Sequence, residues 1–170
     1  MDVIRIWDQH DYDPGWRRFI RRAARAVILT GDGKIALIKS RKEGFYKFPG
    51  GGMKRGESRL AALIRETREE AGLAIIPATV RELGLFWEIR KSIYDREIFE
   101  QRSYYYLAKA KRQIFPQQLD PYEASLGFEL EFVDVREAYK QNQAAAAASR
   151  STFLLRETAV LKEILDRGLA

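Results

Sequence analysis

The alternation of apolar and polar positions along the chain predicts strands mixed with helices. Residues 24–30 and 34–40 are two short apolar runs on either side of Gly31-Asp32-Gly33, a pattern typical of a β-hairpin. Three later segments are rich in β-branched and aromatic residues and are predicted strands: residues 75–89, 98–108 and 128–135. The aromatic, glycine-rich residues 45–53 are expected to form a loop with unusual backbone geometry.

Residues 58–71 are predicted to form a helix. Apolar or small residues recur there at spacings of three and four, in one narrow stripe expected to face the core: Leu60, Leu63, Ile64, Thr67 and Ala71. Gly72 suits the left-handed position that ends a helix. Residues 136–143 and 152–167 are also predicted to be helical. The alanine run 144–148 is expected to extend the first of these two, with a connection to the last helix as the alternative.

The N-terminal segment carries a dense group of basic residues. Arg18, Arg21, Arg22 and Arg25 are spaced as one helix face would place them, and they fit equally an extended entry into the first strand. A solvated basic edge is the simpler interpretation of this group. Steering of phosphate groups is the functional interpretation.

Strands mixed with about three helices indicate one α/β (α+β) domain. The 170 residues suffice for a single domain, and no linker divides them. We expect residues 1–22 to be an N-terminal basic extension and residues 144–170 a C-terminal helical extension. No apolar run approaches the roughly 20 residues that span a bilayer, and the N-terminus has no apolar signal core. The expected location is the cytoplasm, without a membrane partner.

The composition limits the possible chemistry. There is no cysteine, which excludes disulfides, thiolate nucleophiles and cysteine-based zinc sites. The single histidine, His10, is expected on the surface, and one histidine argues against a catalytic triad or a multi-histidine metal site. A metal would therefore need oxygen ligands, which points to Mg²⁺ or Mn²⁺. The net charge of +6 suits an anionic partner such as a nucleotide, a polynucleotide or a membrane surface.

Three glutamates of the predicted helix lie close together. Glu66, Glu69 and Glu70 share an arc of roughly 100° beside the apolar stripe, where their carboxylates repel one another. A divalent cation would remove that penalty, and Glu57 could approach it from the preceding loop. The alternative is an ordinary solvated helix face, in which Arg65 pairs with Glu69 four residues later.

The segment from Gly51 to Leu73 resembles the signature of the Nudix hydrolases, G-x5-E-x7-R-E-U-x-E-E-x-G-U, where U is a bulky aliphatic residue. Eight of its nine specified positions agree: Gly51, Glu57, Arg65, Glu66, Glu69, Glu70, Gly72 and Leu73. The departure is Thr67, which lies on the predicted core stripe, so it concerns packing and not a ligand. Residues 48–52 and 132–138 also look like neighbouring segments of this family, and the resemblance covers roughly residues 23–143.

The resemblance implies the Nudix α/β/α sandwich with a mixed sheet. It also implies that Glu66, Glu69 and Glu70 are the main metal ligands, with Glu57 near the metal. The carbonyl of Gly51 is a further candidate ligand. Arg65 would orient the glutamates by salt bridging.

The activity that the resemblance implies is hydrolysis of a nucleoside diphosphate linked to another group X. Divalent ions would stabilise the charge that builds on the leaving oxygen, and a carboxylate would take a proton from the attacking water. The candidates for this base are Glu69 inside the signature and Glu129 or Glu123 outside it, with Glu129 slightly preferred over Glu123.

Two further functions remain open from the sequence. One is a non-catalytic module on the same fold that binds a nucleotide or RNA, suggested by the net charge and the N-terminal arginines. The other is hydrolysis of an RNA cap or RNA end, ranked below a small nucleotide because nothing marks a long nucleic-acid groove. The protein is expected to be a monomer or a homodimer, with the last helix packed on its own domain.

Overall fold

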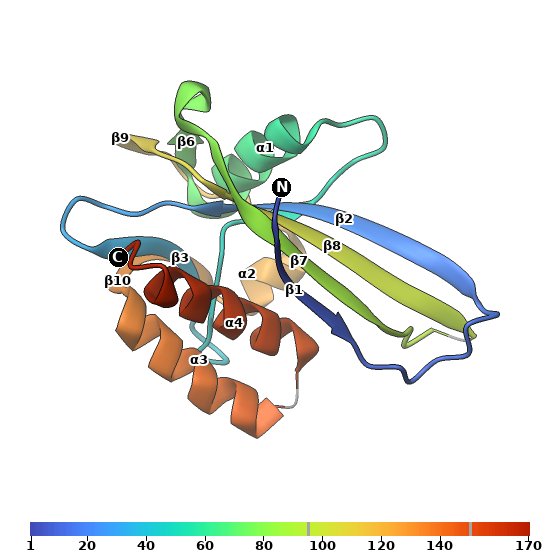
Figure 1. Ribbon diagram of the computed structural model, residues 1–170. Helices are drawn as coiled ribbons and strands as arrows, with labels where there is room; N and C mark the ends of the chain where they lie inside the picture. Colours follow the sequence, from blue (N-terminus) through green and yellow to red (C-terminus); the bar gives the residue numbers. More distant parts are fainter. Residues whose placement is uncertain (95, 150) are drawn as a thin grey trace.

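A mixed five-stranded sheet forms the centre of the protein, seen in a computed structural model that describes residues 1–94, 96–149 and 151–170. In sheet order, the strands are β1 (Val3–Asp8), β7 (Arg81–Lys91), β8 (Glu97–Leu107), β2 (Arg17–Val27) and β5 (Gly50–Gly52). β1 runs parallel to β7 and β2 parallel to β8, whereas β7 and β8 are antiparallel, as are β2 and β5. Figure 1 shows β2, β7 and β8 extending well beyond the helices.

Two smaller sheets complete the β-structure. One contains β10 (Phe128–Asp134), β3 (Lys34–Ser40) and β4 (Tyr46–Lys47), and the other pairs β6 (Leu73–Ile75) with β9 (Ala110–Ile114). The hairpin predicted around Gly31 is present but short: the Thr30 amide donates to the Lys34 carbonyl at 2.8 Å, Leu29 and Ile35 form an antiparallel bridge, and the Ala36 amide donates to the Ile28 carbonyl at 2.9 Å. Beyond the tip its strands join different sheets, because β2 pairs with β8 and β3 with β10.

Helices cover both faces of the main sheet, as Figure 1 shows for α1 on one side and for α3 and α4 on the other. The helices are α1 (Arg59–Ala71), α2 (Pro121–Ser125), α3 (Val135–Ser149) and α4 (Thr152–Asp166). Ala24 and Ala26 of β2 belong to one core cluster with Leu63 of α1, whereas Val27 belongs to a second cluster with Leu161 of α4. Successive strand residues point to opposite faces, so β2 serves both layers. The predicted α/β/α sandwich is confirmed.

The helix that carries the signature begins and ends as predicted. The Ser58 hydroxyl accepts a hydrogen bond from the Ala61 amide at 3.1 Å, and Gly72 ends the helix with φ 67°. Thr67 is fully buried, which agrees with its predicted place on the core face.

The buried stripe of α1 differs from the prediction at its first turn. Leu60 is 42% exposed, and Ala62 is fully buried. Ala62 shares a cluster with Ala24 and Ala26 of β2, so the contact between helix and sheet is made by small side chains that allow close approach. The prediction that Leu60 faces the core is wrong.

The N-terminal segment is built into the main sheet. Arg17–Val27 is one continuous strand, so the arginines lie on extended backbone and not on a helix face. β1 forms the edge of the same sheet beside β7. Residues 1–22 therefore add a strand and half of another to the fold.

Other segments depart from the predictions in detail. The predicted strand 75–89 is interrupted by a 3₁₀ turn at Pro77–Thr79, because proline lacks the amide that a strand needs. The loop 45–53 contains the short strands β4 and β5, while β9 and α2 were not predicted. The alanine run extends α3, as expected. Within the described residues, no helix is long and apolar enough to cross a membrane.

Candidate active site

Two glycines of β5 let the loop before α1 pass through a crowded place. Gly50 has φ 135°, and a Cβ there would collide with the backbone of Ala24. A Cβ on Gly51 would overlap the carboxylate of Glu66. These glycines therefore allow β5 to lie directly between β2 and the carboxylates of α1.

Arg65 gathers three of the four signature carboxylates. Its Nε and Nη2 donate to the two oxygens of Glu57 at 2.8 and 2.9 Å. Its Nη1 donates to Glu66 at 2.7 Å and to Glu69 at 3.0 Å, and Nη2 also donates to the Gly52 carbonyl at 3.2 Å. The planar guanidinium thus joins the loop to the helix, which is the arrangement the resemblance implied for Arg65.

Glu70, the fourth carboxylate, is oriented by other groups. It is 3% exposed and accepts from the Lys47 ammonium at 2.5 Å and from the Gly50 amide at 2.8 Å. The described residues contain no group of three or more acidic or histidine side chains arranged as a ready-made metal site. Three of the four signature carboxylates thus pair with Arg65, and the fourth, Glu70, pairs with Lys47.

A cavity of about 660 Å³ opens beside these carboxylates. Glu66 and Glu70 line it together with Gly50–Gly52 and Lys47. Burial, together with the nearby charges of Glu70 and Glu69, raises the pKa of Glu66 even though Arg65 opposes that change. A cation placed here would relieve this crowding of negative charge.

The two later glutamates named as candidate bases lie in different environments. Glu123 of α2 lines the cavity, and burial and its neighbour Glu70 raise its pKa to about 7. Glu129 of β10 is exposed, is paired with Arg41 at 2.6 Å, and is absent from the cavity lining in the part of the chain that the structure describes. Of these two candidates, Glu123 therefore lies at the cavity and Glu129 lies outside it.

The arginines of β2 divide into paired and available side chains. Arg17 and Arg18 form ion pairs with Glu97 and Glu100 of β8, at 2.6 and 3.2 Å. Arg21 lines the cavity and donates to the side-chain oxygen of Gln101 at 3.1 Å. Among the described residues no carboxylate lies within salt-bridge distance of it.

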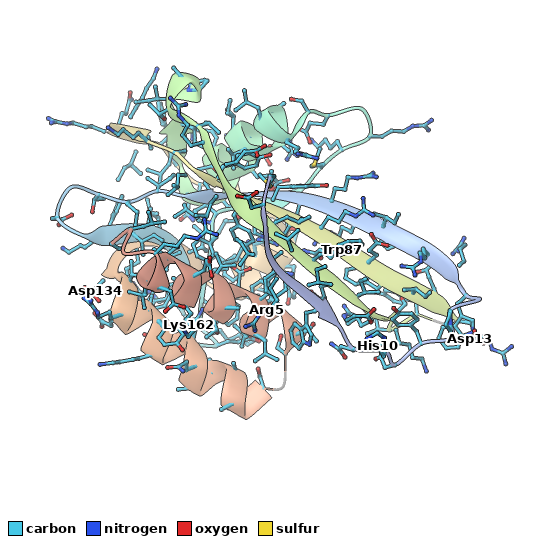
Figure 2. All side chains as sticks on the ribbon, viewed as in Figure 1. Arg5, His10, Asp13, Trp87, Asp134 and Lys162 are labelled. Carbon is cyan, nitrogen blue, oxygen red and sulfur yellow. The ribbon has the colours of Figure 1, made fainter. Side chains whose placement is uncertain are left out.

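The cavity also has an aromatic part that sequence reasoning identified only partly. Phe45, in the aromatic and glycine-rich segment 45–53, packs edge-to-face on Phe153 of α4, with ring centroids 5.4 Å apart. Both line the cavity, together with Phe128. Phe153 was missed because the pattern of α4 predicts only a helix. His10 lies in the connection from β1 to β2, far from α1 (Figure 2), and its side chain is 81% exposed, as expected.

Comparison with known sequences gives a consistent match. A family model described as NUDIX domain matches residues 20–155. A stretch of 68 residues is 40% identical to the "Uncharacterized Nudix hydrolase YvcI" of Bacillus subtilis (strain 168), and covers 40% of this chain and 42% of that protein. Another of 58 residues is 40% identical to the "RNA pyrophosphohydrolase" of Halorhodospira halophila (strain DSM 244 / SL1), and covers 34% of this chain and 31% of that protein. These matches span less than half of either relative.

Comparison with solved structures agrees with the fold. A NUDIX hydrolase from Nitrosomonas europaea is similar with a TM-score of 0.59 and 18% identity, over 88% of this chain and 90% of that one. A mutator MutT protein from Bacillus halodurans is similar with a TM-score of 0.50 and 19% identity, over 71% and 72% of the two chains. At these identities the likeness concerns the fold alone.

Proposed function

Because the chain belongs to the Nudix family, we propose that it hydrolyses the diphosphate bond of a nucleoside diphosphate linked to another group X, with Mg²⁺ or Mn²⁺ as cofactor. One observation carries the proposal. The carboxylates of Glu57, Glu66 and Glu69 converge on Arg65 at distances of 2.7 to 3.0 Å, and Glu66 also lines the cavity beside the glycines of β5.

The donor set fits a hard divalent cation. All of the candidate ligands are oxygen atoms, from the carboxylates of Glu66, Glu69 and Glu70 and the carbonyl of Gly51. The raised pKa of Glu66 supports this assignment, because it reflects a half-buried carboxylate with too little positive charge beside it. When bound, the cation would stabilise negative charge on the phosphates and lower the pKa of water.

The diphosphate would be bound by the chain's own cations. Arg21 and Lys47 line the cavity on the side of the glycines, and Arg21 uses a single donor in the contact with Gln101. A guanidinium presents five donors in a planar fork that matches phosphate oxygens. These two cations would orient the substrate and oppose its charge in the transition state.

Glu123 is proposed as the general base. Its pKa of about 7 lies near the working pH, where a base combines sufficient ionisation with sufficient proton affinity. Its side chain is placed by the capping box of α2, in which its own carboxylate accepts from the Asp120 amide at 3.0 Å. Glu69 remains the candidate base within the signature.

An RNA 5′ end is the second candidate substrate. The relative from Halorhodospira halophila is named an RNA pyrophosphohydrolase, and the arginines of β2 supply basic charge near the cavity. Because the charges of Arg17 and Arg18 are offset by glutamates, a small nucleotide is proposed first. Charge reversal at Arg18, Arg21 and Arg22 should raise the KM for RNA far more than for a mononucleotide if RNA is the substrate.

A panel of diphosphate-containing metabolites tests the proposed function. Purified protein is incubated with each compound in Mg²⁺, in Mn²⁺ and in EDTA, and product release is measured. Release that requires the metal supports hydrolysis, and the best compound identifies X. Nucleotide or RNA binding without any turnover would instead support the non-catalytic binding module.

A further inference from the structure

We infer that Glu157 of α4 is a positioning residue of this site. It holds the backbone between Phe48 and Gly50 in the geometry that orients the carboxylate of Glu70. The inference rests on the proposed function, because it concerns the metal-binding role proposed for Glu70. Glu157 lies just beyond residues 20–155, which the family model matches, so membership of the family assigns it no role.

The buried carboxylate of Glu157 divides its two oxygens between different partners. Glu157 is fully buried, and its Oε2 accepts from the backbone amide of Phe48 at 2.8 Å. Its Oε1 accepts from Nε and Nη2 of Arg156 at 3.2 and 3.1 Å, and from the Tyr105 hydroxyl at 3.4 Å. Oε1 thus accepts from side chains of α4 and β8, while Oε2 accepts from the loop that enters the active site.

Arg25 links Glu157 to the next part of the same loop. Its Nε lies 3.9 Å from Oε1 of Glu157, an ion pair without a hydrogen bond, and its Nη1 donates to the Gly50 carbonyl at 3.1 Å. Arg25 is 3% exposed, so its position depends on these buried contacts. The Pro49 carbonyl between them accepts from the Ala26 amide at 2.8 Å. Three successive residues of the loop are therefore held: Phe48 and Gly50 by the buried side chains of Glu157 and Arg25, and Pro49 by the backbone of β2.

The α1 side of the same loop holds Glu70. The Gly50 amide donates to Glu70 at 2.8 Å, and this carboxylate is 3% exposed. Besides Gly50, its hydrogen-bond donor is Lys47, on the same loop. Any displacement of the loop would therefore move the Gly50 amide and the Lys47 ammonium, the two donors to Glu70 found among the described residues. Groups that orient metal ligands in this way influence metal affinity strongly.

The start of the loop has an anchor of its own. The side chain of Asn142 in α3 accepts from the Tyr46 amide and donates to the Tyr46 carbonyl, both at 2.8 Å. Loss of the contact from Glu157 to Phe48 should therefore displace the loop locally, with the fold retained. This separates a positioning role from a general contribution to stability.

The substitution Glu157→Gln tests the inference without a substrate. An amide has one acceptor oxygen where the carboxylate uses two, and its NH₂ group faces donors. The matched control is Glu163→Gln on the same helix, where Glu163 pairs with Arg167 at 2.6 Å on a more exposed surface. Both variants and the parent are labelled with ¹⁵N-glycine, since the chain has only 12 glycines. Mg²⁺ alone is then titrated.

The amide resonances of Gly50 to Gly52 should shift in Glu157→Gln, while those of Gly31 and Gly33 stay in place. The dissociation constant for Mg²⁺, read from the same resonances, should rise about tenfold. In Glu163→Gln the glycine resonances and the dissociation constant for Mg²⁺ should equal those of the parent. On the best diphosphate found in the panel, kcat should fall with little change in KM.

Unchanged Mg²⁺ affinity in folded Glu157→Gln would overturn the inference and leave the proposed function standing. Absence of Mg²⁺ binding in the parent would contradict the proposed function itself. If Glu157→Gln does not fold, Glu157→Asp replaces it, because that variant keeps the charge beside Arg156 and withdraws from Phe48. Failure of both to fold would show that Glu157 is purely structural and would reject the positioning role.

Discussion

Arg65 donates to both oxygens of the Glu57 carboxylate, through Nε at 2.8 Å and Nη2 at 2.9 Å. Glu57 precedes the N-cap of α1, and Arg65 lies in the middle of the helix, eight positions later. The pair therefore fixes the end of the glycine-rich loop against the face that carries Glu66 and Glu69. The same guanidinium lowers the pKa of Glu57 to about 2.

Glu57→Gln should destabilise the fold in a pH-dependent way. A carboxyl group whose pKa is lower in the folded chain than in the unfolded chain adds stability above the unfolded value, here about 4.5. That contribution disappears as the pH falls toward 2. Urea unfolding in EDTA should therefore show a deficit in unfolding free energy at pH 7 that shrinks between pH 4.5 and about 2. A deficit of constant size would contradict the ion pair.

Gly51→Ala should lower the stability of the fold and displace the Glu66 carboxylate in the active site. The added Cβ would overlap the Glu66 carboxylate, which can move aside only by leaving its ion pair with Arg65 at 2.7 Å, so we expect a cost of about 1 kcal/mol. Gly31→Ala is the matched control, because a Cβ at Gly31 meets no atom within 4 Å. Chemical unfolding should show a change below about 0.5 kcal/mol for the control. Equal effects of the two substitutions would contradict the close packing of Gly51 on Glu66.

Thr67→Val should stabilise the protein. The Thr67 hydroxyl is buried and has no hydrogen-bond partner in the described structure, and an unsatisfied buried group costs about 1 to 3 kcal/mol. Valine has a similar shape and restores the apolar character that the Nudix signature has at this position. The unfolding free energy should rise by about 1 kcal/mol, with activity unchanged. A loss of stability would show that the hydroxyl has a partner.

Glu123→Gln should distinguish the proposed base from the alternatives. A base must be ionised, so kcat of the parent should fall as the pH drops below about 7, the pKa of Glu123. In the variant this pH dependence should disappear, and kcat should fall by a factor of about 10² or more. Glu129 pairs with Arg41 outside the cavity, so Glu129→Gln should keep the kcat of the parent and its dependence on pH. The reverse result would restore Glu129 as the base.

The helix and glycines of the signature could be predicted because their information is local. Ser58, the spacing of α1 and Gly72 specify the helix within about 15 residues. The residues joined to Arg65 are also near it in sequence. Spacing and resemblance together were therefore sufficient to identify this cluster.

The remaining parts of the site depend on contacts between distant segments. Glu123 was named from the sequence as a candidate base but ranked below Glu129, because its burial beside Glu70 is a tertiary property that the capping signal Asp120-Pro121-x-Glu123 does not indicate. Phe153 and Glu157 belong to a helix whose pattern predicts only amphipathic packing. Their roles follow from contacts made more than 100 residues away along the chain, such as Glu157 with Phe48.

The carboxylates beside Arg65 are proposed to support metal-dependent cleavage of a diphosphate. The most direct test compares kcat of the parent and of Glu69→Gln and Glu70→Gln on the best compound of the panel, in saturating Mg²⁺ or Mn²⁺. We expect turnover by the parent that EDTA abolishes, and a fall in kcat of both variants that exceeds the roughly 100-fold typical of changes to groups that only orient a metal ligand. Variants that turn over like the parent would contradict it.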